Sequence, residues 1–189
     1  FDDYTNWTKA TLYGTNMPTV STSNGILTVT PAETYPAAIY HNSVSLSGSF
    51  AIRTRHRSLN TDDDTTPILW FLALEGGDPD DLNSWYQIRD KSSAQRLDKT
   101  INDSETTLES RSNAGGSVNT WYIYEVHQKS NGNKRAFRDD SQWLPSSGWN
   151  SDTALNSGKV AVGREGYSSE WDWIVIRKFS DPDPPWGSG

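Results

Sequence analysis

The segment Thr120–Asp139, TWYIYEVHQKSNGNKRAFRD, decides the fold. Its Asn131-Gly132 pair lies between two runs that alternate apolar and polar residues, and an Asn-Gly pair in this position is a strong local signal for a β-hairpin. In the first run Tyr122, Tyr124 and Val126 share one side, which we expect to face the core. The segment therefore predicts two adjacent antiparallel strands.

The same two-residue period recurs along the chain. The predicted strands are Gly25–Thr30, Ala37–His41, Gly48–Arg57, Pro67–Leu74, Ser84–Asp90, Gln95–Thr100, Thr106–Ser110, Thr120–Gln128, Asn133–Asp139, Gly158–Arg164 and Glu170–Phe179. Clusters of Gly, Asn, Asp and Pro separate them, and the only helix candidate is a short turn near 151–156. Such a chain predicts an all-β fold, an antiparallel sandwich of about eleven strands.

Length and charge limit the function classes. With 189 residues the chain is long enough for one well-buried core, so we expect a single domain over residues 1–180. The Pro/Gly-rich residues 181–189, DPDPPWGSG, are predicted to be a linker within a larger protein. A net charge of −7 argues against nucleic acid as a partner, and no apolar run predicts membrane insertion. The expected unit is a monomeric module of a multidomain protein.

The order of the strand motifs resembles the concanavalin A-like lectin and glucanase superfamily, in particular its laminin-G-like jelly-roll modules. The motifs are Phe1-Asp2-Asp3, Ser47–Arg55, Asn119–Val126, Ser157–Gly163 and Trp171–Arg177, and together they cover nearly the whole chain. The resemblance implies a jelly-roll sandwich. It also implies a carbohydrate-binding or adhesive role in an extracellular or cell-surface protein. Fold alone assigns no function, so the site has to decide.

Catalysis is not favoured by the acidic residues. Glucanases of the superfamily carry Glu-x-Asp-x-x-Glu, and here Glu170 and Asp172 supply the first two acids while Val175 replaces the third. A lyase would need a Tyr/His pair beside a basic or amide group, which Glu125-Val126-His127 resembles only faintly. We therefore predict a non-enzymatic protein; a divergent glycoside hydrolase or lyase, or a structural spacer, remain the alternatives.

Aromatic and basic side chains supply the candidate binding site. The chain has nine Trp and eight Tyr residues, more than a sandwich core uses, and sugar rings stack on exposed aromatic rings. Trp85, Gln87 and Arg89 share one face of a predicted strand, as do Arg53, Arg55 and Arg57 on another. Trp143, Trp149 and Trp171 are assigned to loops. The predicted glycan ligands are Trp85, Gln87, Arg89, Arg55, Arg53, Trp143 and Trp149, although the arginines alternatively form a solvated face with salt bridges, and one loop Trp a packed lid.

Calcium is the expected cofactor, in a structural role. Calcium prefers oxygen ligands, and the resemblance implies that the acidic start of the chain, Asp2 and Asp3, lies beside Asp172 at such a site. Two acidic loops, Asp62–Asp64 and Asp78–Asp81, are further candidates. Solvated acidic loops remain the alternative for all three.

Overall fold

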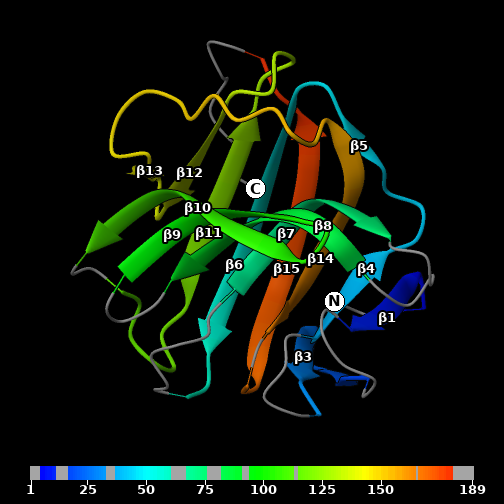
Figure 1. Cartoon of the computed structure of the whole chain (residues 1–189). Helices are drawn as coiled ribbons and strands as arrows, with labels where there is room; N and C mark the ends of the chain where they lie inside the picture. The colour runs from blue at the N-terminus through cyan, green and yellow to red at the C-terminus, as the bar shows by residue number, and fades with distance from the viewer. Residues whose placement is uncertain are drawn as a thin grey trace.

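The computed structural model describes residues 5–11, 17–32, 37–60, 67–75, 82–90, 94–112, 115–164 and 166–180. These residues form strands and loops (Figure 1). The strands are β1 (Trp7–Thr11), β2 (Thr19–Ser23), β3 (Ile26–Thr30), β4 (Ala37–His41), β5 (Leu46–Ser47), β6 (Phe50–Ser58), β7 (Pro67–Glu75), β8 (Leu82–Asp90), β9 (Ala94–Ile101), β10 (Ser104–Ser112), β11 (Tyr122–Gln128), β12 (Lys134–Arg138), β13 (Ser141–Leu144), β14 (Ser157–Arg164) and β15 (Ser169–Lys178). In the described ranges no helix is long and apolar enough to cross a membrane.

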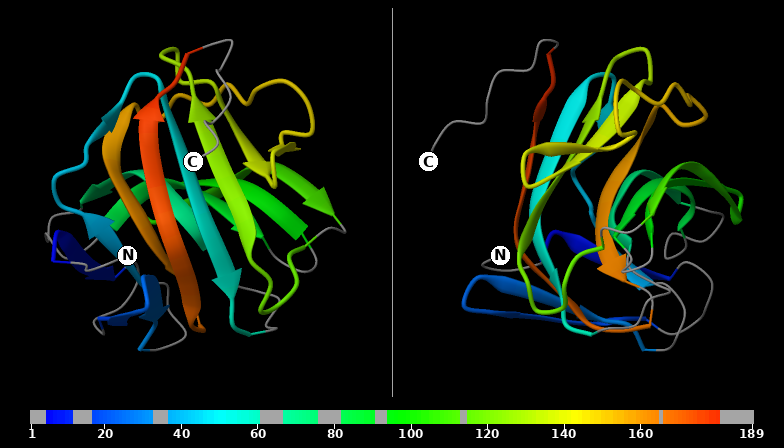
Figure 2. Two further views of the ribbon diagram at one scale, coloured as in Figure 1. Left: turned by 180° about the vertical axis from the view of Figure 1, so that it is seen from behind. Right: turned by 90° about the vertical axis from the view of Figure 1, so that its left-hand side faces the viewer.

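The strands form two antiparallel sheets that pack face to face, as the right-hand view of Figure 2 shows. Sheet A has the order β1-β4-β14-β7-β8-β9-β10, with β5 paired to β14. Sheet B has the order β13-β12-β11-β6-β15-β3-β2. The all-β sandwich predicted from the sequence is confirmed, with fifteen strands in the described ranges rather than about eleven.

The hairpin of β11 and β12 is confirmed. Lys129 N donates to Asn133 O at 2.8 Å and Gly132 N donates to Lys129 O at 2.9 Å, which closes the turn. Gly132 has a φ of 85°, a backbone conformation that glycine adopts without steric cost. The sequence signal and the tertiary structure agree here because the turn is a local structure that needs no distant partner.

The core lies between the sheets. Tyr124 and Val126 are 2% and 1% exposed, and Tyr122 packs against the same cluster, so the predicted core face of β11 is confirmed. The buried core includes Leu27, Val29, Ile39, Phe50, Ile52, Leu69, Phe71, Tyr86, Ile88, Val160, Val162 and Trp171. Each of these residues belongs to a strand, in which alternate side chains point to opposite faces. At Phe71 the alternation is interrupted: Leu72, with a φ of 53°, lies in the same core, and the register of β7 and β8 shifts there.

Three features differ from the sequence-based predictions. Strands β1, β2, β5 and β13 were not predicted, because their Ser- and Thr-rich segments lack a clear apolar alternation. The predicted short helix near 151–156 is wrong: this segment is a loop in which Ala154 N donates to Asp152 Oδ1 at 3.1 Å. The predicted linker, residues 181–189, lies outside the described residues.

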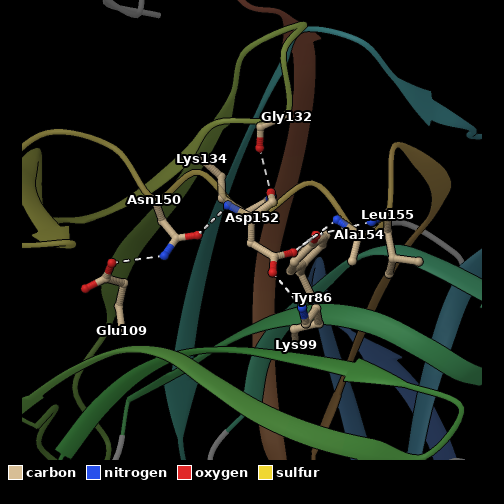
Figure 3. Close-up of polar contacts among 9 residues, drawn as sticks. All are labelled: Tyr86, Lys99, Glu109, Gly132, Lys134, Asn150, Asp152, Ala154 and Leu155. Carbon is tan, nitrogen blue, oxygen red and sulfur yellow. Dashed lines mark hydrogen bonds and ion pairs between the residues drawn. The ribbon is translucent and has the colours of Figure 1, made fainter.

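A buried lysine, Lys134, connects the loop of residues 151–156 to both sheets (Figure 3). Lys134 on β12 is fully buried, and its Nζ donates to Gly132 O at 2.8 Å and to Asp152 O. The same ammonium lies 3.9 Å from the ring centroid of Tyr86 on β8. Lys99 Nζ on β9 lies 2.5 Å from Asp152 Oδ2. The loop therefore contacts both β8, through Tyr86, and β9, through Lys99.

Stability should rise with pH in the range where Lys134 titrates. Burial lowers the pKa of Lys134 to about 8, from about 10.5 in the unfolded chain, so between these values the unfolded chain binds more protons than the folded one. Urea unfolding should therefore give about 1 to 2 kcal/mol more stability at pH 10 than at pH 8, relative to Lys134→Met. Burial also raises the pKa of Tyr86, so above pH 10 the unfolded chain loses this proton first and the stability of both proteins should fall with rising pH. Parallel curves for the two proteins would contradict this result.

Candidate functional site

Strand alternation places the candidate site on the outer face of sheet A, which we call the site face. Trp85, Gln87 and Arg89 point to this face, while Tyr86 and Ile88, between them, lie in the core. The structure thus confirms that the three predicted residues of β8 share one face. The register with β9 and β10 adds neighbours that the sequence analysis did not identify: Thr100 opposite Trp85, Asp98 opposite Gln87, and Glu105 opposite Thr100.

Aromatic side chains cover one half of the site face. Trp70 from β7 and Tyr40 from β4 form a second buried cluster with Trp85, separate from the main core, and its smaller members are Ala10, Ala38, Ala73, Leu82 and Ala161. Trp85 is 2% exposed. The prediction of an open stacking platform at Trp85 is therefore wrong, because its ring is packed among these residues.

Polar side chains form a connected row on the other half. Trp70 Nε1 donates to Gln87 Oε1 at 2.8 Å, and Gln87 Nε2 donates to Glu105 Oε2 at 3.0 Å. Arg89 Nη2 donates to the same Glu105 oxygen at 2.5 Å, and Arg89 Nε lies 3.3 Å from Asp98 Oδ2. These contacts join four strands, β7 to β10, and the hydrogen bonds among Trp70, Gln87, Glu105 and Arg89 hold these side chains in place.

Several polar atoms of this face are buried at a cost. Burial raises the pKa of Asp98, and the Thr107 hydroxyl and the guanidinium groups of Arg89 and Arg96 act in the opposite direction. Thr100 is fully buried, yet neither its Oγ1 nor the Nε of Arg96 has a hydrogen-bond partner in the part of the chain that the structure describes. Each unsatisfied buried polar group costs about 1–3 kcal/mol, so this face is held in place against an energetic cost.

The arginine stripe lies on the other side of the molecule. Arg53, Arg55 and Arg57 point outward from β6 in sheet B, on what we call the arginine face. Their partners are acids: Arg53 Nη2 is 2.6 Å from Asp140 Oδ1, Arg55 Nη1 is 2.6 Å from Asp172 Oδ2, and Arg57 Nε is 2.6 Å from Glu170 Oε2. The prediction that Arg53 and Arg55 share a site with Trp85 is wrong, because β6 and β8 belong to different sheets.

The tryptophans assigned to loops have different surroundings. Trp143 is 3% exposed on β13, with its ring centroid 5.6 Å from that of Tyr124, and Trp171 is fully buried on β15, so both are core residues and the loop assignment is wrong. Strand β13 was not predicted from the sequence because Pro145 and two serines, which are typical of loops, follow it directly. Trp149 does lie in a loop, half-buried, with Arg135 Cζ 4.1 Å and Lys129 Nζ 4.3 Å from its ring centroid. Trp149 and Trp85 therefore lie on opposite sides of the sandwich.

The glucanase-like acids are engaged in ion pairs. A β-bulge at Asp172 breaks the register of β15 and β6 between Trp171 and Trp173. It leaves Glu170 beside Arg57 and Asp172 beside Arg55. As for calcium, no cluster of three or more acidic or histidine side chains occurs among the residues described, and Asp2, Asp3, Asp62–Asp64 and Asp78–Asp81 lie outside them. The calcium site stays a prediction.

A small pocket at the end of the sandwich gathers titratable side chains. It is lined by His56, Ser58, Asp90, Gly116, Ser117, Tyr122 and Tyr124 and has a volume of about 20 Å³, which is room for one water molecule. Burial raises the pKa of Tyr124, whose hydroxyl donates to Asp90 Oδ2 at 2.5 Å. A β-elimination base needs a lowered tyrosine pKa and space for a sugar ring, so this pocket has neither property of a lyase site.

Comparison with known proteins supports the architecture. No protein-family model and no curated protein matches the sequence. Among solved structures, a carbohydrate-binding module, CBM66, from Bacillus subtilis has a TM-score of 0.73 at 12% identity, covering 93% of this chain and 98% of that one. A protein of unknown function with a galectin-like fold, also from Bacillus subtilis, has a TM-score of 0.71 at 10% identity over 93% and 90% of the two chains.

Enzymes occur among these neighbours too. A prokaryotic β-1,3-1,4-glucanase (lichenase) derived from a mouse hindgut metagenome has a TM-score of 0.65 at 13% identity, covering 94% of this chain and 96% of that one. At such identities the likeness concerns the fold and not the activity. Two antiparallel sheets with this order of strands, matched by lectin-like and glucanase structures over nearly their full length, show that the chain has the concanavalin A-like jelly-roll fold.

Proposed function

We propose that this chain is a non-catalytic carbohydrate-binding module of an extracellular or cell-surface protein, and that the site face binds the glycan. The observation that supports this proposal most is the polar row Gln87–Glu105–Arg89 beside Trp70 and Trp85. Fixed donors and acceptors next to aromatic rings form the combination by which proteins hold sugar hydroxyls and sugar C–H faces. The carbohydrate-binding module CBM66 among the neighbours is consistent with this role.

The binding should be weak to moderate in affinity. Trp70 and Trp85 are buried, so they support the polar row from below and offer the ligand little stacking area. Most of the binding energy then comes from hydrogen bonds that replace hydrogen bonds to water, and these contribute little net energy each.

A calcium ion at Asp2, Asp3 and Asp172 stays part of the proposal in a structural role. A ligand that binds only the folded chain raises its melting temperature, so a melting temperature that a chelator leaves unchanged would contradict the calcium site.

Two glutamates test the proposal with a matched pair of variants. Glu105→Ala removes the most exposed carboxylate of the polar row, which is 34% exposed, so glycan binding should fall. Glu170→Ala removes the acid of a similar Arg–Glu pair on the arginine face, so glycan binding should stay unchanged. Urea unfolding shows that both variants fold, and retention on a glycan array measures their binding. Equal binding by both variants would contradict a ligand at the site face.

One observation favours a second candidate function, a glycoside hydrolase. Asp98 and Glu105 are two carboxylates that both contact Arg89 on the site face, and a glycoside hydrolase uses a pair of carboxylates. Incubation with a polysaccharide panel separates the two functions. A binding module releases no reducing ends, whereas a hydrolase releases them and loses this activity in both Asp98→Asn and Glu105→Gln.

A further inference from the structure

The charges around the polar row of the site face balance one another. Four charged side chains of β8, β9 and β10 point to this face, two cations (Arg89 and Arg96) and two anions (Asp98 and Glu105). Lys159 on β14 shares the face but lies beyond β7, where its Nζ donates to Asn42 O at 2.7 Å. From this balance we propose that the site face selects a neutral glycan, and that Glu105 and Arg89 bind a pair of adjacent hydroxyl groups. The inference rests on the proposed function and names the class of its ligand.

Arg89 is already neutralised by protein groups. Its Nη2 is 2.5 Å from Glu105 Oε2, and its Nε is 3.3 Å from Asp98 Oδ2. Recognition of a uronate carboxylate or a sulfate by arginine uses two parallel N–H groups of one guanidinium edge. In Arg89 the Nε and Nη2 groups already contact carboxylates, so an acidic sugar would have to displace Glu105 or Asp98.

Glu105 presents the accessible charge of this pair. Its side chain is 34% exposed, compared with 11% for Arg89 and 0% for Asp98. Its Oε2 accepts hydrogen bonds from Gln87 and Arg89, and its Oε1 has no hydrogen-bond partner in the described strands and loops. An approaching ligand therefore meets a carboxylate oxygen, which repels a uronate and accepts a hydrogen bond from a hydroxyl.

Adjacent hydroxyl groups fit this pair of side chains. One hydroxyl donates to Glu105 Oε1, and its neighbour accepts from Arg89 Nη1, which has no partner among the described residues. A hydroxyl supplies both a donor and an acceptor, whereas an ionised carboxylate only accepts. The arginines of the arginine face do not change this conclusion, because Arg53, Arg55 and Arg57 lie on the opposite sheet and each has an acidic partner.

A matched pair of polymers tests the inference. We would measure affinity electrophoresis of the purified chain in gels that contain polygalacturonate or the same polymer after reduction of its carboxyl groups, together with an array of neutral plant and microbial glycans. We expect retention by neutral polymers only, with less than about a twofold change between low and high salt, since screening affects charge–charge attraction. We expect Glu105→Gln to weaken the neutral interaction about tenfold or more, because a charged hydrogen bond is lost.

The control variant is Glu170→Gln, which breaks a similar Arg–Glu pair on the arginine face and should leave retention unchanged. Salt-sensitive retention by polygalacturonate and not by its reduced form would overturn the neutral-ligand inference while leaving carbohydrate binding intact. Equal retention of Glu105→Gln and the unmodified chain by a neutral polymer would also overturn the inference. Absence of retention by every polymer and array member would instead overturn the proposed function itself.

Discussion

Gly158→Ala is expected to destabilise the fold by at least about 3 kcal/mol. Gly158 is buried in β14, close to β7, and a Cβ atom there would lie 2.6 Å from Leu72 O and 2.7 Å from Ala73 O. Backbone atoms of a paired strand cannot rotate away as a side chain does, so β14 and β7 would have to separate. The melting temperature should fall by about 6–12 °C for a domain of this size.

Gly48→Ala is the matched control for this substitution. Gly48 has a φ of 64°, and no atom lies within 4 Å of the position that a Cβ would occupy. Only the backbone conformation then costs energy, about 1–2 kcal/mol. If Gly158→Ala melts at the same temperature as Gly48→Ala, the close approach of the two strands is not the reason that glycine is needed at position 158.

Asp90→Ala should cost about 3–5 kcal/mol, because three donors lose their acceptor, among them the buried Tyr124 hydroxyl and the half-buried Arg138 guanidinium. Asp90 is 6% exposed at the end of β8. Its Oδ2 accepts from Tyr124 Oη at 2.5 Å and from Arg138 Nη1 at 3.0 Å, and its Oδ1 accepts from Gly116 N at 3.0 Å. Since Tyr124 and Arg138 belong to sheet B, these bonds hold the two sheets together at this end, and their loss should appear directly in urea unfolding.

Two further variants set the scale of this effect. Asp90→Asn keeps one acceptor oxygen, which can stay with Tyr124 and Arg138, but loses the charge and places an NH2 donor opposite Gly116 N, so we expect a cost below that of alanine. Asp140→Ala removes the partner of another arginine, Arg53, from a side chain that is 72% exposed, and should cost less than about 0.5 kcal/mol. Equal effects of Asp90→Ala and Asp140→Ala would show that burial does not strengthen the Asp90 contacts.

Much of the fold could be predicted from the sequence because its signals are local. The two-residue period identifies a strand and its buried side from a few neighbouring residues, as in Tyr122, Tyr124 and Val126. The Asn131-Gly132 turn fixes the register of one hairpin by its own geometry. Where the local pattern was weak, as in Ser141–Leu144, the strand and the burial of Trp143 were missed.

By itself, then, the sequence determined eleven of the fifteen described strands, which side chains of these strands share a face, and that Trp85, Gln87 and Arg89 lie together. Only the tertiary structure decided which sheet each strand joins. Pairings such as β6 with β15 connect residues more than a hundred positions apart, and no local pattern encodes them. For that reason Arg55 lies on a different sheet from Trp85, contrary to the prediction, whereas the register of β8, β9 and β10 places Asp98, Thr100 and Glu105 beside Trp85 and Gln87. A binding site on a sheet is made of neighbours across strands, and packing between distant segments selects those neighbours.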